Sequence, residues 1–193
     1  IRKFGFELSS SQNEAVEKFT DFLFNKEDDG IFLLKGYAGT GKTSLVAAIV
    51  NAMISLKYKV VLLAPTGRAA KVFASYAGHT AFTIHKNIYR QKSAADGEGV
   101  FSLGFNTLSH AVFFVDEASM IPNASAEGAV FGTGRLLDDL FHYVYSGVRC
   151  HLILLGDNAQ LPPVGFTDSP ALSVEQLRSY GLKVYETQLT LIA

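Results

Sequence analysis

A lysine and a threonine end a glycine-rich segment early in the chain, and this combination can bind phosphate and magnesium. Residues 36–43 read Gly-Tyr-Ala-Gly-Thr-Gly-Lys-Thr, which is the spacing G-x-x-x-x-G-K-T. In such a loop, backbone N–H groups point at the phosphates, the lysine reaches the β- and γ-phosphates, and the last hydroxyl ligates Mg²⁺. The residues expected to contact the nucleotide are Gly36, Ala38, Gly39, Thr40, Gly41, Lys42, Thr43 and Ser44.

The segments on either side of this loop favour a phosphate site over a glycine-rich turn that matches by chance. The apolar run 31–34 precedes the loop, and the helix-forming run 44–53 follows it. A strand would therefore deliver the loop to the N-terminus of a helix, where partial positive charge stabilises a bound anion. The sequence predicts that the chain binds a nucleoside triphosphate.

Two adjacent acids follow a second apolar run. Residues 113–115 are Phe-Phe-Val, and Asp116 and Glu117 come directly after them. At the end of a buried strand, Asp116 can hold the Mg²⁺ that bridges the phosphates, and Glu117 can orient and deprotonate an attacking water. The alternative is an ordinary charged turn. A small-molecule kinase is disfavoured, because the second acid suits hydrolysis and no acceptor site is evident.

A glutamine follows a later apolar strand, residues 151–155. If this strand lies between the first and the third strands, Gln160 lies beside the γ-phosphate. Its amide has both a donor and an acceptor, so Gln160 can sense whether that phosphate is present. Pro162 and Pro163 stiffen the next segment, which would pass a small shift onward.

Composition indicates an ordinary globular chain of one domain, 193 residues long with 48% hydrophobic and 18% charged residues. No apolar run approaches the roughly 18 residues of a membrane span, and the start is not of signal-peptide type. The only cysteine is Cys150, so no intramolecular disulfide can form, and we expect it to be a buried strand residue. These features fit a cytoplasmic protein without a membrane partner.

Charge is distributed unevenly, although the net charge is only −1. The stretch 30–95 contains no Asp or Glu but holds nine of the seventeen basic residues. This asymmetry suggests one positive surface for a polyanion, and the alternative is that several lysines merely solvate a face.

Strand-like and helix-like runs alternate along the chain, which predicts an α/β fold with a mostly parallel sheet. Such a sheet binds ligands at the carboxyl ends of its strands. Thr66 is placed to cap one helix and Gly78 to end it. An inserted loop or hairpin interrupts the pattern near 91–109. The strands are expected at 31–35, 59–64, 111–115, 151–155 and 182–185, and the later helices at 66–77, 134–145 and 174–180.

Two segments of the acid-free stretch can contact a polyanion. Thr66 and Gly67 begin a helix, which suits a backbone phosphate. The run 83–86, Thr-Ile-His-Lys, adds a hydroxyl, an imidazole and an ammonium, although a single histidine is more often structural. Phe82 and Tyr89 are either stacking surfaces or core residues, and we expect them to be core.

Taken together and in order, these motifs resemble those of superfamily-one helicases. The similar branch contains the RecD-like subunit of exodeoxyribonuclease V, phage Dda-like helicases and the Pif1 type, and the resemblance covers about residues 8–191. The segments that carry it are 36–43, 64–71, 83–86, 116–119 and 156–164.

This resemblance implies a P-loop NTPase of RecA-like fold, with sheet order 5-1-4-3-2. It implies that the substrate is ATP with Mg²⁺. It also implies translocation on single-stranded DNA from 5′ to 3′, in a protein that can belong to a larger repair or recombination complex. Gln12 matches the glutamine that reads adenine. The single-strand contacts that it implies are Pro65, Thr66, Gly67, Arg68, Lys71, Thr83 and His85.

In one respect the chain departs from the family pattern. The family's fourth motif begins with Leu-Thr and soon presents an arginine, whereas here 188–193 begins that motif and the sequence stops. We therefore expect residues 1–193 to be the first of two RecA-like motor domains, nearly inactive alone. The alternative function is a nucleotide-gated ATPase switch on DNA without directional unwinding.

Overall fold

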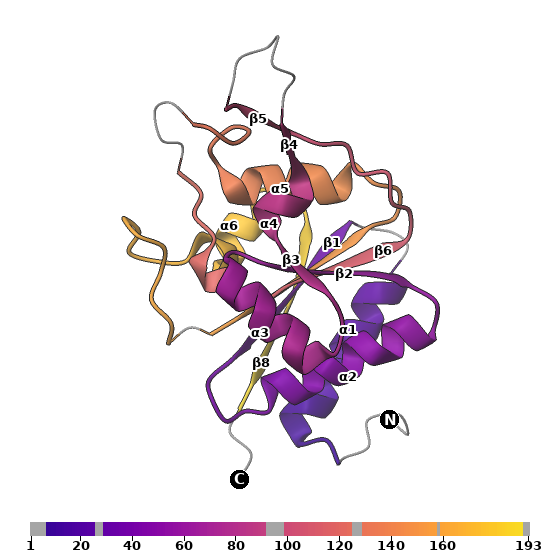
Figure 1. The fold of residues 1–193 in the computed structure, drawn as a ribbon. Helices are drawn as coiled ribbons and strands as arrows, with labels where there is room; N and C mark the ends of the chain where they lie inside the picture. The colour runs from indigo at the N-terminus through magenta and orange to yellow at the C-terminus, as the bar shows by residue number, and fades with distance from the viewer. Residues whose placement is uncertain (1–6, 26–28, 92–98, 125–128, 158, 191–193) are drawn as a thin grey trace.

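A computed structural model describes residues 7–25, 29–91, 99–124, 129–157 and 159–190, and the elements alternate along the chain as the periodicity predicts (Figure 1). In chain order they are α1 (Ser10–Phe24), β1 (Gly30–Gly36), α2 (Lys42–Ser55), β2 (Lys59–Ala64), α3 (Gly67–Ala77), β3 (Ala81–Thr83), α4 (Ile84–Ile88), β4 (Tyr89–Gln91), β5 (Phe101–Leu103), β6 (Ala111–Val115), η2 (Ala118–Met120), α5 (Leu136–Tyr145), β7 (His151–Gly156), η3 (Pro170–Leu172), α6 (Val174–Arg178) and β8 (Lys183–Leu189).

Six parallel strands form the main sheet in the order β3-β2-β6-β7-β1-β8. Read from the other edge, the five expected strands stand in the expected order 5-1-4-3-2, and β3 is an additional edge strand beyond β2. The sequence did not predict β3, because three residues are too short for a periodic pattern to register. The fold is the predicted α/β fold.

Helices cover both faces of this sheet. On one face α1, α2 and α3 enclose a core that contains Phe19, Val50 and Phe73, together with Phe32 and Phe114 from the strands. On the other face α5 and α6 enclose a second core. Every residue of β1 and of β6 is buried, as continuous apolar runs predict for strands covered on both sides.

Local sequence signals explain both ends of α3 and the start of α5. The Thr66 side chain accepts a hydrogen bond from the Ala69 N–H, and Gly78, with φ 72°, ends α3. Helix α5 begins at Leu136 rather than at 134, because Gly134 has a φ of 78°, which a right-handed helix cannot contain.

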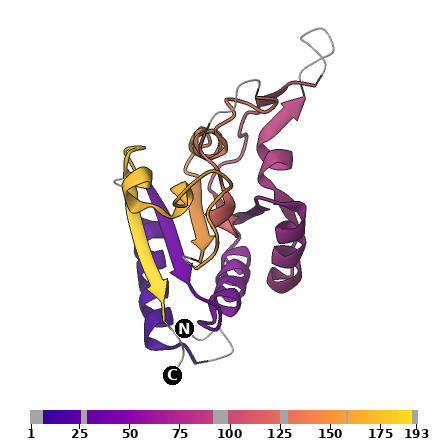
Figure 2. The same ribbon diagram turned by 90° about the vertical axis from the view of Figure 1, so that its left-hand side faces the viewer.

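The expected insertion is a hairpin whose strands are β4 and β5, with 92–98 outside the described residues. The strands pair antiparallel, with Tyr89 opposite Leu103, so the hairpin begins slightly before the expected boundary. It projects from the end of the molecule away from α2 (Figures 1 and 2). Tyr89 anchors it, because its buried hydroxyl donates to Asp139 Oδ2 at 2.6 Å.

Two further expectations concern the position of Cys150 and the absence of a membrane-spanning helix. Cys150 is buried, but it lies immediately before β7 rather than within it. In the part of the chain that the structure describes, no helix is both long and apolar enough to cross a membrane.

Candidate functional site

The strand order brings the phosphate loop, the two acids and the segment with Gln160 together at the carboxyl ends of the strands. Strand β7 lies between β1 and β6 and is parallel to both. The phosphate loop, the pair Asp116–Glu117 and the segment with Gln160 therefore leave three neighbouring strands at their carboxyl ends. The strand with Gln160 at its end therefore lies between the first and third expected strands, which was the condition for expecting Gln160 near the γ-phosphate. The carboxyl ends of the strands are also where α/β sheets bind ligands.

The phosphate loop has a backbone that requires glycine. Gly39 and Gly41 have φ values of 84° and 74°, in the left-handed region. A Cβ on Gly36 would lie 2.8 Å from Thr40 Oγ1, so a side chain has no room there. The Thr40 hydroxyl donates to the Tyr37 carbonyl at 2.8 Å, which holds the loop closed across its own turn.

Lys42, Thr43 and Ser44 form the first turn of α2. The Lys42 ammonium donates to the Gly156 carbonyl at 3.0 Å, so it lies at the end of β7. Thr43 and Ser44 are exposed, and their hydroxyls are therefore accessible to a ligand. The helix N-terminus supplies partial positive charge at the same place.

Gln12 is attached to this loop. Its buried side chain accepts a hydrogen bond from the Ser9 N–H at 3.0 Å and donates to the Thr40 carbonyl at 3.3 Å. The first bond belongs to a capping box that begins α1. The geometry places Gln12 beside the phosphate loop, whereas its reading of adenine stays a prediction.

Asp116 is buried and held by two donors. Its Oδ1 accepts from the Glu117 N–H at 2.9 Å, and its Oδ2 accepts from the Tyr76 hydroxyl at 2.7 Å. Burial and the carboxylate charge raise the pKa of Tyr76, so the phenol stays protonated and donates. Glu117 adopts a φ of 53°, a left-handed conformation that turns the chain sharply after β6.

The oxygen donors at this edge fit a magnesium ion that arrives with a nucleotide. Mg²⁺ in such sites takes one or two carboxylates, phosphate oxygens and waters, and Asp116 with the Thr43 hydroxyl offers this chemistry. Within the described ranges, no group of three or more His, Cys, Asp or Glu could form an all-protein cage for a metal. When bound, the ion would neutralise charge on the phosphates.

Gln160 is linked to the segment that follows the two acids. Its Oε1 accepts from the Ser119 hydroxyl at 2.6 Å, and the Ser119 carbonyl accepts from the Ser169 hydroxyl at 2.9 Å. The sequence analysis assigned no role to Ser119, although this serine ends the segment 116–119 that carries part of the family resemblance. The bond connects the ends of β6 and β7.

The predicted DNA contacts gather at two adjacent helix starts. Thr66 begins α3 after β2, and Thr83 begins α4 after β3, where its hydroxyl accepts from the Lys86 N–H at 3.2 Å. Because β2 and β3 pair in parallel, both starts lie at one edge. Gly67, Arg68 and Lys71 are exposed there.

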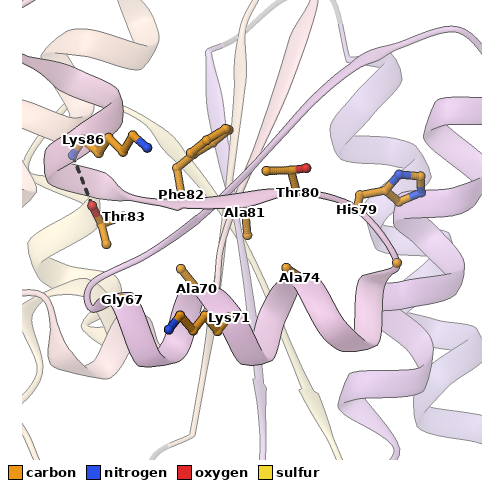
Figure 3. Close-up of a pocket in the computed structure, with 11 residues that line it drawn as sticks. Gly67, Ala70, Lys71, Ala74, His79, Thr80, Ala81, Phe82, Thr83 and Lys86 are labelled. Atoms are coloured by element: carbon orange, nitrogen blue, oxygen red, sulfur yellow. Dashed lines mark hydrogen bonds between the residues drawn. The ribbon is translucent and has the colours of Figure 1, made fainter.

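A groove of about 800 Å³ runs between α3 and β3 (Figure 3). Figure 3 shows Phe82 and Lys86 on one side of β3, while Ala81 points toward α3. Phe82 is 38% exposed, so its assignment to the core was wrong, and the Lys86 ammonium lies 5.4 Å from its ring centroid. The described residues that line the groove include no acid; they are Gly67, Ala70, Lys71, Ala74, Gly78, His79, Thr80, Ala81, Phe82, Thr83 and Lys86.

A smaller pocket, of about 290 Å³, joins Pro65 and Thr66 to His85. The His85 ring packs edge-on against Phe131, with 5.0 Å between centroids. Burial lowers the pKa of His85, so its imidazole is a neutral wall of this pocket near pH 7. Tyr89 also lines the pocket and is a core residue, as expected.

The positive surface is smaller than the charge count predicts. Lys35 is nearly buried and pairs with Glu186 at 2.7 Å. Lys57 and Lys59 lie at the amino end of β2, whereas Thr66 follows its carboxyl end. Among the residues that the structure describes, the lysines and arginines at or beside the groove are Arg68, Lys71 and Lys86. Lys42 belongs to the phosphate loop, and Lys92 lies outside the described residues.

The parallel sheet, the phosphate loop after β1 and the acids after β6 define a P-loop NTPase. The chain belongs to the AAA domain family, whose profile matches residues 7–174. It is 34% identical over 137 residues to the ATP-dependent RecD2 DNA helicase of Deinococcus radiodurans, covering 69% of this chain and 16% of that protein.

A second relative belongs to the same class, and a solved structure shares the fold. The chain is 30% identical over 144 residues to the ATP-dependent DNA helicase dda of Enterobacteria phage T4, covering 72% of this chain and 29% of that protein. Its fold resembles the Pif1 helicase of Candida albicans with a TM-score of 0.55 at 20% identity, over 97% of this chain and 40% of that one. The resemblance to superfamily-one helicases is confirmed, and the chain spans less than a third of RecD2 and of dda.

Proposed function

We propose that this chain is the first RecA-like motor domain of an ATP-dependent DNA helicase that translocates on single-stranded DNA from 5′ to 3′. The observation that carries the proposal is the arrangement around α3. Its first two turns present Arg68 and Lys71 beside the groove, and the Tyr76 hydroxyl donates to Asp116, the acid at the nucleotide site. A nucleotide site and a polyanion surface thus share one helix.

Each residue at the nucleotide site has a distinct role in binding or hydrolysing ATP. Lys42 neutralises charge on the β- and γ-phosphates, and Asp116 with Thr43 would hold the Mg²⁺ that arrives with the nucleotide. Glu117 takes a proton from the attacking water, whose oxygen bonds to the γ-phosphorus while the bond from that phosphorus to ADP breaks. Gln160 contacts the γ-phosphate and reports its loss through Ser119, and Gln12 contacts adenine.

The DNA surface combines backbone contacts with one stacking position. Thr66, Gly67 and Thr83 offer helix starts to phosphates, and Arg68 and Lys71 add charge. Phe82 borders the groove and presents an exposed ring on the side of β3 that faces away from α3, where a base can stack without sequence preference.

A second RecA-like domain completes the motor by supplying an arginine across the ATP cleft. Such an arginine is worth roughly 10³–10⁵ in rate, so residues 1–193 alone should hydrolyse ATP very slowly. We place the complete protein in the cytoplasm, where a repair or recombination complex is a suitable partner.

Replacing Arg68 and Lys71 by alanine in the full-length protein should weaken single-strand binding. Each lost phosphate contact should reduce the slope of log affinity against log salt by about 0.7. Titration of a fluorescent oligothymidine at several salt concentrations measures both quantities. DNA stimulation of ATP hydrolysis should fall with the affinity.

The matched control is Lys57→Ala, which removes an exposed lysine at the opposite edge of the sheet. It should leave affinity and slope unchanged. If Arg68→Ala with Lys71→Ala binds the oligonucleotide as the control does, the surface at α3 does not contact DNA.

A further inference from the structure

Tyr76 connects the proposed DNA surface to the proposed metal carboxylate. It lies on α3, whose first turns carry Arg68 and Lys71, and its hydroxyl donates to Asp116 Oδ2 at 2.7 Å. The two partners are 40 residues apart in sequence, so the bond exists only in the folded chain. A charge-assisted bond of this kind is among the stronger hydrogen bonds in proteins.

Both partners of this bond are held in place by their surroundings. The Tyr76 ring packs on Phe73, with 5.1 Å between centroids, and Phe73 is fully buried. Asp116 is 8% exposed, and its other oxygen accepts from the Glu117 N–H. One donor to the carboxylate therefore belongs to its own chain segment, and the other belongs to α3.

We propose that Tyr76 is a positioning residue that couples helix α3 to Asp116, so that DNA contact at the start of α3 changes how well the carboxylate holds Mg²⁺ with ATP. This inference rests on the proposed function. The 11 residues of α3 form a rigid rod of about 16 Å, at about 1.5 Å per residue. A shift at its first turn therefore moves the tyrosine as well.

The coupling must act in both directions. If DNA binding favours the position of α3 in which Tyr76 donates to Asp116, nucleotide with Mg²⁺ must favour DNA binding by the same factor. Residues that orient a metal ligand typically affect metal affinity by roughly 10–100-fold. The bond is thus strong enough to carry a measurable signal between the two sites.

The test is Tyr76→Phe in the full-length protein, which keeps the ring on Phe73 and removes one oxygen. Binding of a fluorescent ATP analogue is titrated with Mg²⁺, with and without oligothymidine. We expect the Mg²⁺ concentration for half-maximal binding to rise about tenfold. The gain in analogue affinity that DNA produces should fall at least about threefold, because the link that carries it is lost.

The matched control is Tyr180→Phe, which removes a tyrosine bond to Asp138 on the other face of the sheet. It should match the wild type in both titrations, and thermal unfolding should show that both variants are folded. The inference is overturned if Tyr76→Phe leaves the half-maximal Mg²⁺ concentration and the DNA-dependent gain in affinity unchanged. It is also overturned if Tyr180→Phe changes both quantities equally, and neither result affects the proposed function. If the wild type shows no DNA effect on nucleotide binding, the proposed function fails as well.

Discussion

Replacing Lys42 by alanine in the full-length protein should reduce ATP hydrolysis by about 10²–10³-fold, with or without DNA, because the change removes the ammonium that offsets charge on the phosphates. The structure places this ammonium at the end of β7, 3.0 Å from the Gly156 carbonyl, beside the loop that binds phosphate. A release assay for inorganic phosphate measures the rate. Nucleotide affinity should fall in parallel.

Lys59→Ala is the matched control, since Lys59 is exposed at the start of β2 and lies at the opposite edge of the sheet. It should hydrolyse ATP at the wild-type rate. Wild-type hydrolysis by Lys42→Ala would refute the assignment of 36–43 as the phosphate loop.

Replacing Glu117 by glutamine should separate binding from hydrolysis. Glutamine keeps the size of the side chain but cannot accept a proton, so the rate constant should fall by about 10²–10⁴-fold. ATP affinity should stay close to the wild-type value, because Lys42 and the loop backbone still bind the phosphates. Equilibrium binding and single-turnover hydrolysis measure the two effects separately.

Glu175→Gln makes the same chemical change at an exposed position on α6 and should leave hydrolysis unchanged. If Glu117→Gln instead lowers ATP affinity and hydrolysis equally, Glu117 holds the nucleotide and is not the base.

Chemistry that depends on local spacing could be predicted from the sequence. The phosphate loop, the acids after β6 and the cap at Thr66 each occupy a few consecutive residues. The loop needs glycines for its backbone, the acids supply carboxylates for Mg²⁺ and water, and the cap needs a hydroxyl. Periodicity also located the five main strands. Their order in the sheet came from the resemblance, because hydrophobic runs do not say which strands are neighbours.

Contacts between distant segments could not be predicted. The bond from Tyr76 to Asp116 and the pair of Lys35 with Glu186 join residues far apart in sequence, and each depends on how helices and strands pack. The positive surface was overestimated for the same reason. Phe82 was assigned to the core by its type, although an aromatic between His79 and Lys86 in an acid-free stretch is itself a signal for a stacking position.

Strand displacement by the full-length protein tests the motor assignment most directly. Duplexes with a single-stranded 5′ tail, a 3′ tail or no tail are mixed with protein and ATP, and the released strand is followed by fluorescence. We predict ATP-dependent release from the 5′-tailed duplex, and none with Lys42→Ala or with residues 1–193 alone. Release only from the 3′-tailed duplex would reverse the proposed direction. DNA-stimulated hydrolysis without release from any duplex would contradict the motor assignment and support the nucleotide-gated switch.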